Sequence, residues 1–184
     1  MVIVAMLRGV NVGGRNKIAM AELRSLCAGL KLRDAQTYVQ SGNVVFRTDE
    51  RDMAALAARI EKAIEKKFGF RPSVILRTAA ELKRVIARNP VAKRSGIEPA
   101  KLLVSFLAGV PSVEARDNLR GMKTDPEEMW IEGSELYIYF PNGMGKSKLP
   151  WSRMDKILGV AGTGRNWNSV VKLLEMAEAM EAEE

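Results

Sequence analysis

The sequence predicts an α+β fold with two tandem ferredoxin-like (βαββαβ) units, a connecting helix and a C-terminal helix. The first observation is an alternation of buried-strand and amphipathic-helix patterns, in the order βαββαβ, over residues 1–78. The second is that the same order returns over residues 101–184, after a segment with Pro, Gly and basic residues. We therefore expect one unit at 1–78, a connecting helix and linker at 79–100, and a second unit with the C-terminal helix at 101–184.

The first unit is predicted from local hydrophobic patterns. Residues 2–7 are an unbroken apolar run rich in β-branched side chains, which is typical of a buried strand. The segment 52–68 places Leu56, Ile60 and Ile64 on one face, which favours an amphipathic helix. A tight-turn signal at 41–43 separates two strand patterns. The expected strands are 2–7, 37–40, 44–47 and 73–76, and the expected helices are 19–31 and 52–68.

The connecting segment and the second unit are predicted in the same way. Thr78 and Glu81 have the spacing of a capping box, and Asn89-Pro90 ends the helix that they begin. Gly133-Ser134 indicates a hairpin turn between two strand patterns. The expected strands are 102–107, 129–131, 136–140 and 162–165, and the expected helices are 111–119, 150–159 and one that Asn166 or Asn168 caps and that runs to about Met180.

The residue types that are missing restrict the chemistry. The sequence has no histidine, so Ser-His-Asp and Cys-His catalysis and every His-ligated metal site are excluded. The single cysteine, Cys27, lies on the apolar stripe of a predicted helix, where we interpret it as a small buried hydrophobe. The sequence therefore indicates no metal site, leaves any cofactor and any catalytic residue unknown, and leaves open whether the protein is an enzyme.

The charge distribution favours anionic partners. Lys and Arg number 29 against 22 Asp and Glu, for a net charge of +7. Five glutamates lie in the last ten residues, so the rest of the chain is more basic than the total suggests. No apolar run reaches the roughly 20 residues that a membrane span needs, and residues 1–10 lack the basic flank of a signal peptide. We expect a cytoplasmic protein without membrane contact, and the sequence does not indicate an oligomeric state.

Four predicted loops combine glycine, asparagine and basic residues. Glycine lets backbone N–H groups approach an anion, and the N-terminus of a following helix favours negative charge. The alternative is that these residues only form tight turns and caps. The candidate ligand-binding residues are Arg8, Asn11, Gly13, Gly14, Lys17, Gln40, Ser41, Asn43, Asn142, Gly143, Gly145, Lys146, Ser147, Lys148, Arg165 and Asn166.

The third loop contains Gly145-Lys146-Ser147, which invites comparison with a Walker phosphate-binding loop. That pattern requires a glycine at the position of Phe140, and no parallel strand–helix unit is predicted around it. A Walker site is therefore rejected, and a looser anion-binding loop with Lys146 and Lys148 is retained. Apart from Asp155 in a predicted helix, the segment 142–172 has no carboxylate to hold magnesium.

Four segments together resemble the signature segments of the uncharacterised bacterial domain-of-unknown-function family 1697. They are Leu7–Gly14, Tyr38–Phe46, Phe140–Leu149 and Thr163–Val170. The departures are small, with Val10 where the family often has Ile and Ser169 where it often has Thr. The resemblance implies a cytoplasmic α+β protein with ferredoxin-like subdomains, and it implies no established activity, substrate or catalytic residue.

Three functions remain open from the sequence. The first is binding of a small phosphorylated or nucleotide-like anion, with basic side chains (Arg8, Lys146, Lys148 and Arg165) as anion contacts and asparagines (Asn11, Asn43, Asn142 and Asn166) as orienting groups. The second is a single-stranded RNA module, in which Tyr137 and Tyr139 stack on bases. The third is a protein-interaction module without chemistry, which pairs through sheet edges or the acidic C-terminal helix.

Overall fold

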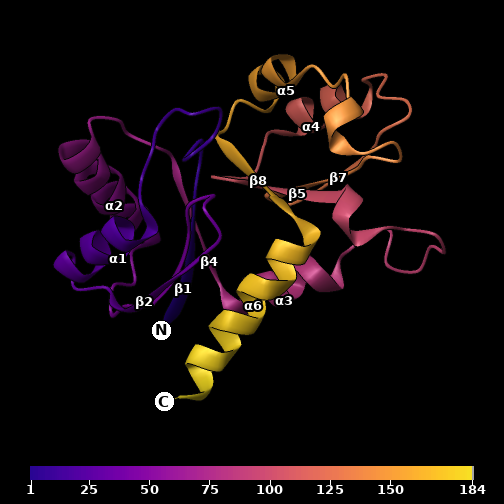
Figure 1. Ribbon diagram of the computed structural model, residues 1–184. Helices are drawn as coiled ribbons and strands as arrows, with labels where there is room; N and C mark the ends of the chain where they lie inside the picture. Colours follow the sequence, from indigo (N-terminus) through magenta and orange to yellow (C-terminus); the bar gives the residue numbers. More distant parts are fainter. Residues whose placement is uncertain (184) are drawn as a thin grey trace. The chain divides into compact units, whose positions relative to one another are not determined.

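The chain folds around two buried strands, one at the centre of each of two sheets. The computed structural model describes residues 1–183, and both of its sheets are four-stranded and antiparallel throughout (Figure 1). Their strand orders are β2-β3-β1-β4 and β6-β7-β5-β8, which is the same order in both. The predicted α+β fold of tandem ferredoxin-like units is therefore confirmed.

The first sheet is covered on one face by two helices (Figure 1). Ile3, Ala5 and Leu7 alternate on that face of the first strand, where they pack against apolar side chains of both helices. The elements are β1 (Val2–Leu7), α1 (Met20–Gly29), β2 (Arg33–Tyr38), β3 (Asn43–Arg47), α2 (Met53–Phe68) and β4 (Val74–Thr78).

The second sheet repeats this plan with shorter helices. Its core joins Leu103 and Leu107 of the central strand to Leu119, Met154 and Leu158 of the helices. The elements are η1 (Pro99–Lys101), β5 (Leu102–Leu107), α4 (Val113–Arg120), β6 (Glu128–Glu132), β7 (Glu135–Tyr139), η2 (Met144–Lys146), α5 (Trp151–Leu158) and β8 (Gly162–Asn166).

Two further helices carry the chain between the units. The compact units are Met1–Arg84 with the segment from Lys172 onward, and Val85–Val171, so the boundaries fall inside α3 (Ala79–Ala87) and α6 (Trp167–Ala182). Within the first unit, Lys83 Nζ lies 2.8 Å from Glu178 Oε1. This division differs from the expected one, which placed the whole C-terminal helix with the second unit.

The start of α3 is fixed by the capping box that the sequence indicates. The Thr78 amide donates to Glu81 Oε2 at 2.8 Å, and the Glu81 amide donates to Thr78 Oγ1 at 3.2 Å. Each side chain thus satisfies an N–H group that the first turn of a helix leaves unpaired. The predicted capping box is confirmed.

The edge strand β2 is the element whose position differs most from the expected one. The sequence places it at 37–40, whereas the strand runs from Arg33 to Tyr38 and Val39 begins the turn. Asp34 has a φ of 55° next to a shift in register, so the strand contains a bulge. Its polar, exposed side chains carry no alternation that marks a strand.

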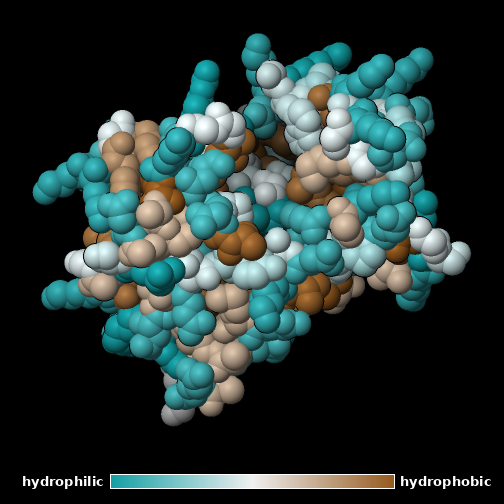
Figure 2. Space-filling view, in the orientation of Figure 1, coloured by the Kyte–Doolittle hydropathy of each residue, from teal (hydrophilic) through white to brown (hydrophobic). Residues whose placement is uncertain are grey.

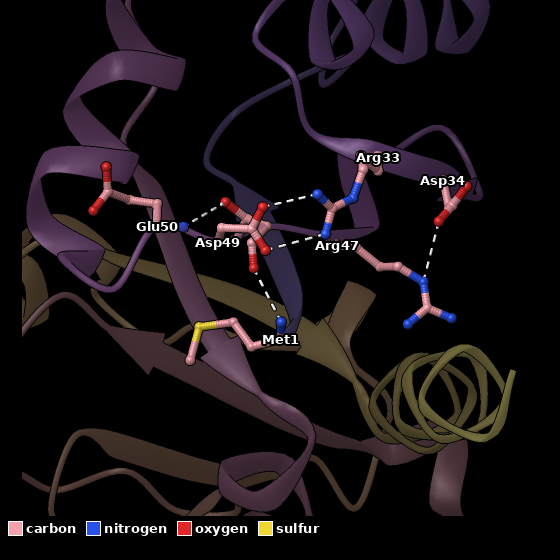
Figure 3. A network of polar contacts seen from close by, with 7 residues as sticks. Met1, Arg33, Asp34, Arg47, Asp49 and Glu50 are labelled. Atoms are coloured by element: carbon pink, nitrogen blue, oxygen red, sulfur yellow. Dashed lines mark hydrogen bonds and ion pairs between the residues drawn. The ribbon is translucent and has the colours of Figure 1, made fainter. Parts of the chain in front are cut away.

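A network of polar contacts closes the end of the first unit at which β3 finishes (Figure 3). Arg33 forms a two-bond contact with Asp49, at 2.8 and 3.1 Å. The buried Arg47 pairs with Asp34 at 3.1 Å and also donates to the backbone carbonyl of Met180. A buried guanidinium is stable only when its donors are satisfied, so Arg47 holds β2, β3 and the end of α6 together.

Hydrophilic side chains cover most of the face seen in Figure 2, and the apolar patches there are small and separate. The exposed large apolar side chains are scattered singly over several loops and helix starts, including Val12, Val39, Val110 and Val113. Over residues 1–183, no helix has both the length and the apolar character to cross a membrane.

Candidate functional site

The loop between β1 and α1 is held to the β2–β3 turn by one asparagine. Asn11 has a φ of 55°, and its Nδ2 donates to the carbonyls of Ile18 at 2.9 Å and Gln40 at 2.7 Å. Its Oδ1 accepts from the Ile18 amide at 2.9 Å. The structure thus brings together two loops that the sequence singles out. The polar side-chain atoms of Asn11 form hydrogen bonds with the backbone of both loops.

The β2–β3 turn is shaped by close packing. A Cβ on Gly42 would lie 2.9 Å from Cβ of Leu7, and the residue has a φ of 74°, so only glycine fits without strain. Asn43 is fully buried and donates to the Tyr38 carbonyl at 3.1 Å and to Ser41 Oγ at 2.9 Å. Ser41 and Asn43 therefore stabilise the turn itself.

Gly13 and Gly14 form the tip of a small hairpin within the β1–α1 loop. Both have positive φ, at 57° and 74°, and the Arg15 amide donates to the Val12 carbonyl at 3.1 Å. Two consecutive positive φ values are those of a type I′ turn. The two glycines allow this turn, and the nearby Arg8 and Lys17 side chains are half-buried and exposed, respectively.

The loop between β7 and α5 leaves its cations in solvent. It begins with a turn in which the Gly143 amide donates to the Phe140 carbonyl at 2.9 Å, with Asn142 exposed between them. Lys146 and Lys148 are exposed. Between them, Ser147 Oγ accepts from the Leu149 amide at 3.2 Å. Gly145 lies in η2, and the loop ends where Pro150 begins α5.

Arg165 and Asn166 lie on β8 and bond to nearby backbone and side-chain groups. Arg165 is only 5% exposed, and its Nη1 donates to Thr163 Oγ1 at 2.7 Å and to the Gly164 carbonyl at 2.8 Å. Desolvation lowers the pKa of Arg165 to about 10. Asn166 donates to the Ala100 carbonyl at 2.7 Å, and its Oδ1 accepts from the Asn168 amide at the start of α6.

A basic depression of about 370 Å³ lies between α4 and α5 of the second unit, and no single motif in the sequence marks it. It is lined by Asn118, Gly121, Met122, Lys123, Pro150 and Arg153. The cations in this lining are Lys123 and Arg153, both exposed, and the lining contains no carboxylate. Its sequence signals are a lysine just beyond the glycine that ends one helix and an arginine in the first turn of the next.

The backbone at this depression adds to the positive charge on one side. Pro150 occupies the N-cap of α5 without a side-chain hydrogen bond and lines the depression, so the positive end of that helix dipole lies at its edge. Lys123 follows the C-terminus of α4, where a cation is also favoured. The depression combines two flexible cations, one uncapped helix start and the amide of Asn118.

The aromatic side chains proposed for base stacking are buried. Tyr137 is 0% exposed, and its hydroxyl donates to the Val85 carbonyl at 2.8 Å. Burial raises the pKa of Tyr137, and Glu135 adds to the effect. Tyr139 is also buried, with Arg94 6.0 Å from its ring centre. Neither ring presents a free face on which a base can stack.

Other chemistry has little support in the part of the chain that the structure describes. Cys27 is buried, and desolvation raises its pKa to about 12, which suppresses the reactive thiolate. Within residues 1–183, the structure contains no group of three or more His, Cys, Asp or Glu side chains placed to hold a metal ion.

Comparison with known proteins identifies a family without a known function. A family model described as "Protein of unknown function (DUF1697)" matches residues 1–137. The fold is similar to that of the conserved bacterial protein SP0830 from Streptococcus pneumoniae, with a TM-score of 0.75 and 22% sequence identity. That match covers 96% of this chain and 98% of the other. A comparison with curated proteins gave no match.

Proposed function

Because the chain belongs to the DUF1697 family, whose function is unknown, we propose a function from the chemistry of its own surface. The protein binds a small phosphorylated anion in the α4–α5 depression of the second unit. Lys123 and Arg153 are the anion contacts, and Asn118 donates a neutral hydrogen bond. No reaction is included in this proposal.

The observation that carries the proposal is the lack of partners for Lys123 and Arg153. Among the described residues, neither side chain has an ion-pair partner. Arg71 and Arg94, by contrast, each lie close to a glutamate, at 3.1 and 2.8 Å. A depression with two unpaired cations and no lining carboxylate attracts an anion, and a guanidinium matches a phosphate with two parallel bonds.

The loop that leads into Pro150 supports the same conclusion. Lys146 and Lys148 are exposed and lie just before the start of α5. They enlarge the positive field around that helix start, which raises the rate at which an anionic ligand arrives. In this proposal they guide the ligand, while the depression holds it.

Single-stranded RNA is the alternative ligand, and the structure favours it less. Sequence-tolerant binding of single strands depends on exposed aromatic side chains as well as on basic ones. Tyr137 and Tyr139 are buried in the second unit, which removes the sheet-face mode that the ferredoxin-like order suggested. An RNA bound only through phosphates would lose affinity steeply as salt is added.

A thermal-shift experiment tests the proposal with pyrophosphate as the probe. At 100 times its dissociation constant, a ligand adds about 2.7 kcal/mol of stability, so the melting temperature of the unaltered protein should rise. The double variant Lys123→Gln/Arg153→Gln should lose the shift, because each charged hydrogen bond contributes about 1.5–3 kcal/mol. Arg59→Gln, an exposed residue of α2, is the matched control and should keep the shift.

Two results would overturn the proposal. One is a pyrophosphate shift that is absent, or that is equal in the double variant and in Arg59→Gln. The other is a shift produced only by a short single-stranded RNA and erased at high salt, which would assign the basic surface to nucleic acid.

A further inference from the structure

A second cavity shares Met122 with the basic depression and is partly open to solvent; we call it the apolar cavity because most of its lining residues are apolar. It has a volume of about 60 Å³ and lies between the end of α4 and the β6–β7 hairpin. Its walls are Leu119, Met122, Met129, Ile131 and Leu136, with Arg120 and Thr124 as the polar members.

Met122 is the side chain that the two spaces share. It lines the basic depression together with Lys123 and Arg153, and it lines the apolar cavity together with Met129. Met122 is half-buried, and a thioether side chain with three rotatable bonds adapts easily to what lies beside it. The depression and the apolar cavity therefore share one adaptable wall residue.

Solvent reaches this cavity, so its apolar walls stay in contact with water when no ligand is bound. A short alkyl group that covers these walls removes apolar surface from water, which is favourable by about 25 cal/mol per Å². The apolar walls therefore favour a ligand that carries a small apolar group.

We propose that the ligand is an anionic group joined to a short alkyl group, that is, a short-chain alkyl phosphate or a related ester. The phosphate lies between Lys123 and Arg153, and the alkyl group passes Met122 into the apolar cavity. This inference rests on the proposed function and specifies its ligand.

The size of the cavity sets the length of the apolar group. A cavity that holds benzene measures about 150 Å³, and one that holds a single water needs about 10–15 Å³. The apolar cavity here, at about 60 Å³, lies between these limits. It accepts an alkyl group of a few carbons and excludes an aromatic ring or a nucleobase.

A homologous series of phosphates tests the inference on the unaltered protein. Inorganic phosphate, methyl, ethyl, propyl and phenyl phosphate are titrated at constant ionic strength, and the amide signals of Gly121 and Met122 are followed by NMR. Affinity should rise by up to about fourfold for each buried CH2. The rise should stop after about two or three carbons, and phenyl phosphate should bind no better than inorganic phosphate.

A variant that fills the apolar cavity distinguishes the contribution of this cavity to ligand affinity from that of the depression. Met129 lines the apolar cavity and is absent from the lining of the depression. Met129→Phe should remove the gain from the alkyl group and leave the affinity for inorganic phosphate unchanged. Val110→Phe, an exposed loop position, is the control and should keep the gain.

The outcomes distinguish this inference from the proposed function. Equal affinities for inorganic, ethyl and propyl phosphate, all lost in Lys123→Gln/Arg153→Gln, would overturn the alkyl pocket and leave anion binding standing. The absence of binding by any phosphate would overturn both. Because the series uses the unaltered protein, the test does not depend on how well Met129→Phe folds.

Discussion

The two units build their long polar loops at opposite ends of the same sheet plan, and they use them differently. In the first unit the long loop follows the first strand, β1, whereas in the second unit it follows the third strand, β7. These strands run antiparallel in each sheet, so the loops leave from opposite ends of their respective sheets. One βαββαβ plan thus places its long polar loop at either end of the sheet.

The difference lies in how the polar groups are satisfied. In the first unit, Asn11 bonds to the backbone of its own loop and of the β2–β3 turn, Asn43 bonds within that turn, and the glycines supply positive φ. In the second unit, Lys146 and Lys148 stay exposed, and so do Lys123, which lies just after α4, and Arg153 in α5. Glycine and asparagine in these loops therefore shape the backbone, and the proposed anion contacts are the unpaired cations of the second unit.

The largest expected effect comes from the glycine at the first unit's turn. Gly42→Ala places a Cβ 2.9 Å from Cβ of Leu7 at a φ of 74°, so overpacking and backbone strain add. We expect a loss of about 3 kcal/mol in the free energy of unfolding. Urea denaturation measures it.

Gly143→Ala in the second unit is the matched comparison for Gly42→Ala. Its φ of 85° and ψ of 146° lie close to a region that is essentially restricted to glycine, but no atom lies within 4 Å of the added Cβ, so only the strain remains. We expect a loss of about 2 kcal/mol. Equal losses at the two glycines would break the comparison, because they would show that both loops are packed alike.

The next effect concerns the asparagine that joins the two loops of the first unit. Asn11→Ala removes three hydrogen bonds to Ile18 and Gln40 and leaves a residue at a φ of 55°, so we expect a loss of about 2–3 kcal/mol. Lys148→Ala should change stability by no more than about 0.5 kcal/mol, because its side chain is exposed. Thermal denaturation of both variants checks this.

A third variant separates the two causes of the stability loss at Asn11, which are the lost hydrogen bonds and the backbone strain. Asn11→Gly relieves the strain but restores no hydrogen bond, so it should be more stable than Asn11→Ala and less stable than the unaltered protein. If Asn11→Ala melted like the unaltered protein, the first unit's loop would not be held by internal bonds.

The sequence predicts the buried part of this fold well and the exposed part less well. Strand β1 is visible as an unbroken apolar run because both of its faces are buried, and helix α2 is visible from its period because one face is apolar. Strand β2 shows no such period, because it is an exposed edge with a bulge at Asp34. Val39 looks like a strand residue, yet it lies in the turn with a φ of 51°.

The candidate site is predictable only in part, for a related reason. The loops at 8–17 and 140–148 are visible as local compositions of Gly, Asn and basic residues. Lys123 and Arg153 line the same depression because α4 packs against α5, and this proximity cannot be read from the sequence around either residue. Whether a given asparagine serves the backbone or a ligand also depends on its neighbours in space, as the bond from Asn11 to Gln40 shows.

The smallest expected effect is a loss in the free energy of unfolding at alkaline pH. It compares a buried titratable group in the core of each unit. The unfolded Cys27 thiol ionises near its ordinary pKa of 9.0, while burial raises the pKa of the folded thiol to about 12. Between these values the unfolded state has released a proton that the folded state keeps, so stability falls as pH rises. We expect a loss approaching 1.4 kcal/mol per pH unit from pH 9 upward, or about 1 kcal/mol by pH 10.

Cys27→Ala is the control, because it lowers stability by a constant amount and removes the proton that is released. Tyr137 in the second unit has an ordinary pKa of 10.0 that burial raises, so its contribution begins one pH unit later. Urea denaturation at pH 7, 9 and 10 should therefore show a decline that is larger by about 1 kcal/mol at pH 10 in the unaltered protein than in Cys27→Ala, in which only the smaller contribution of Tyr137 remains. A parallel decline in both proteins would mean that the thiol is hydrated in the folded state, and that the core of the first unit around α1 is open to water.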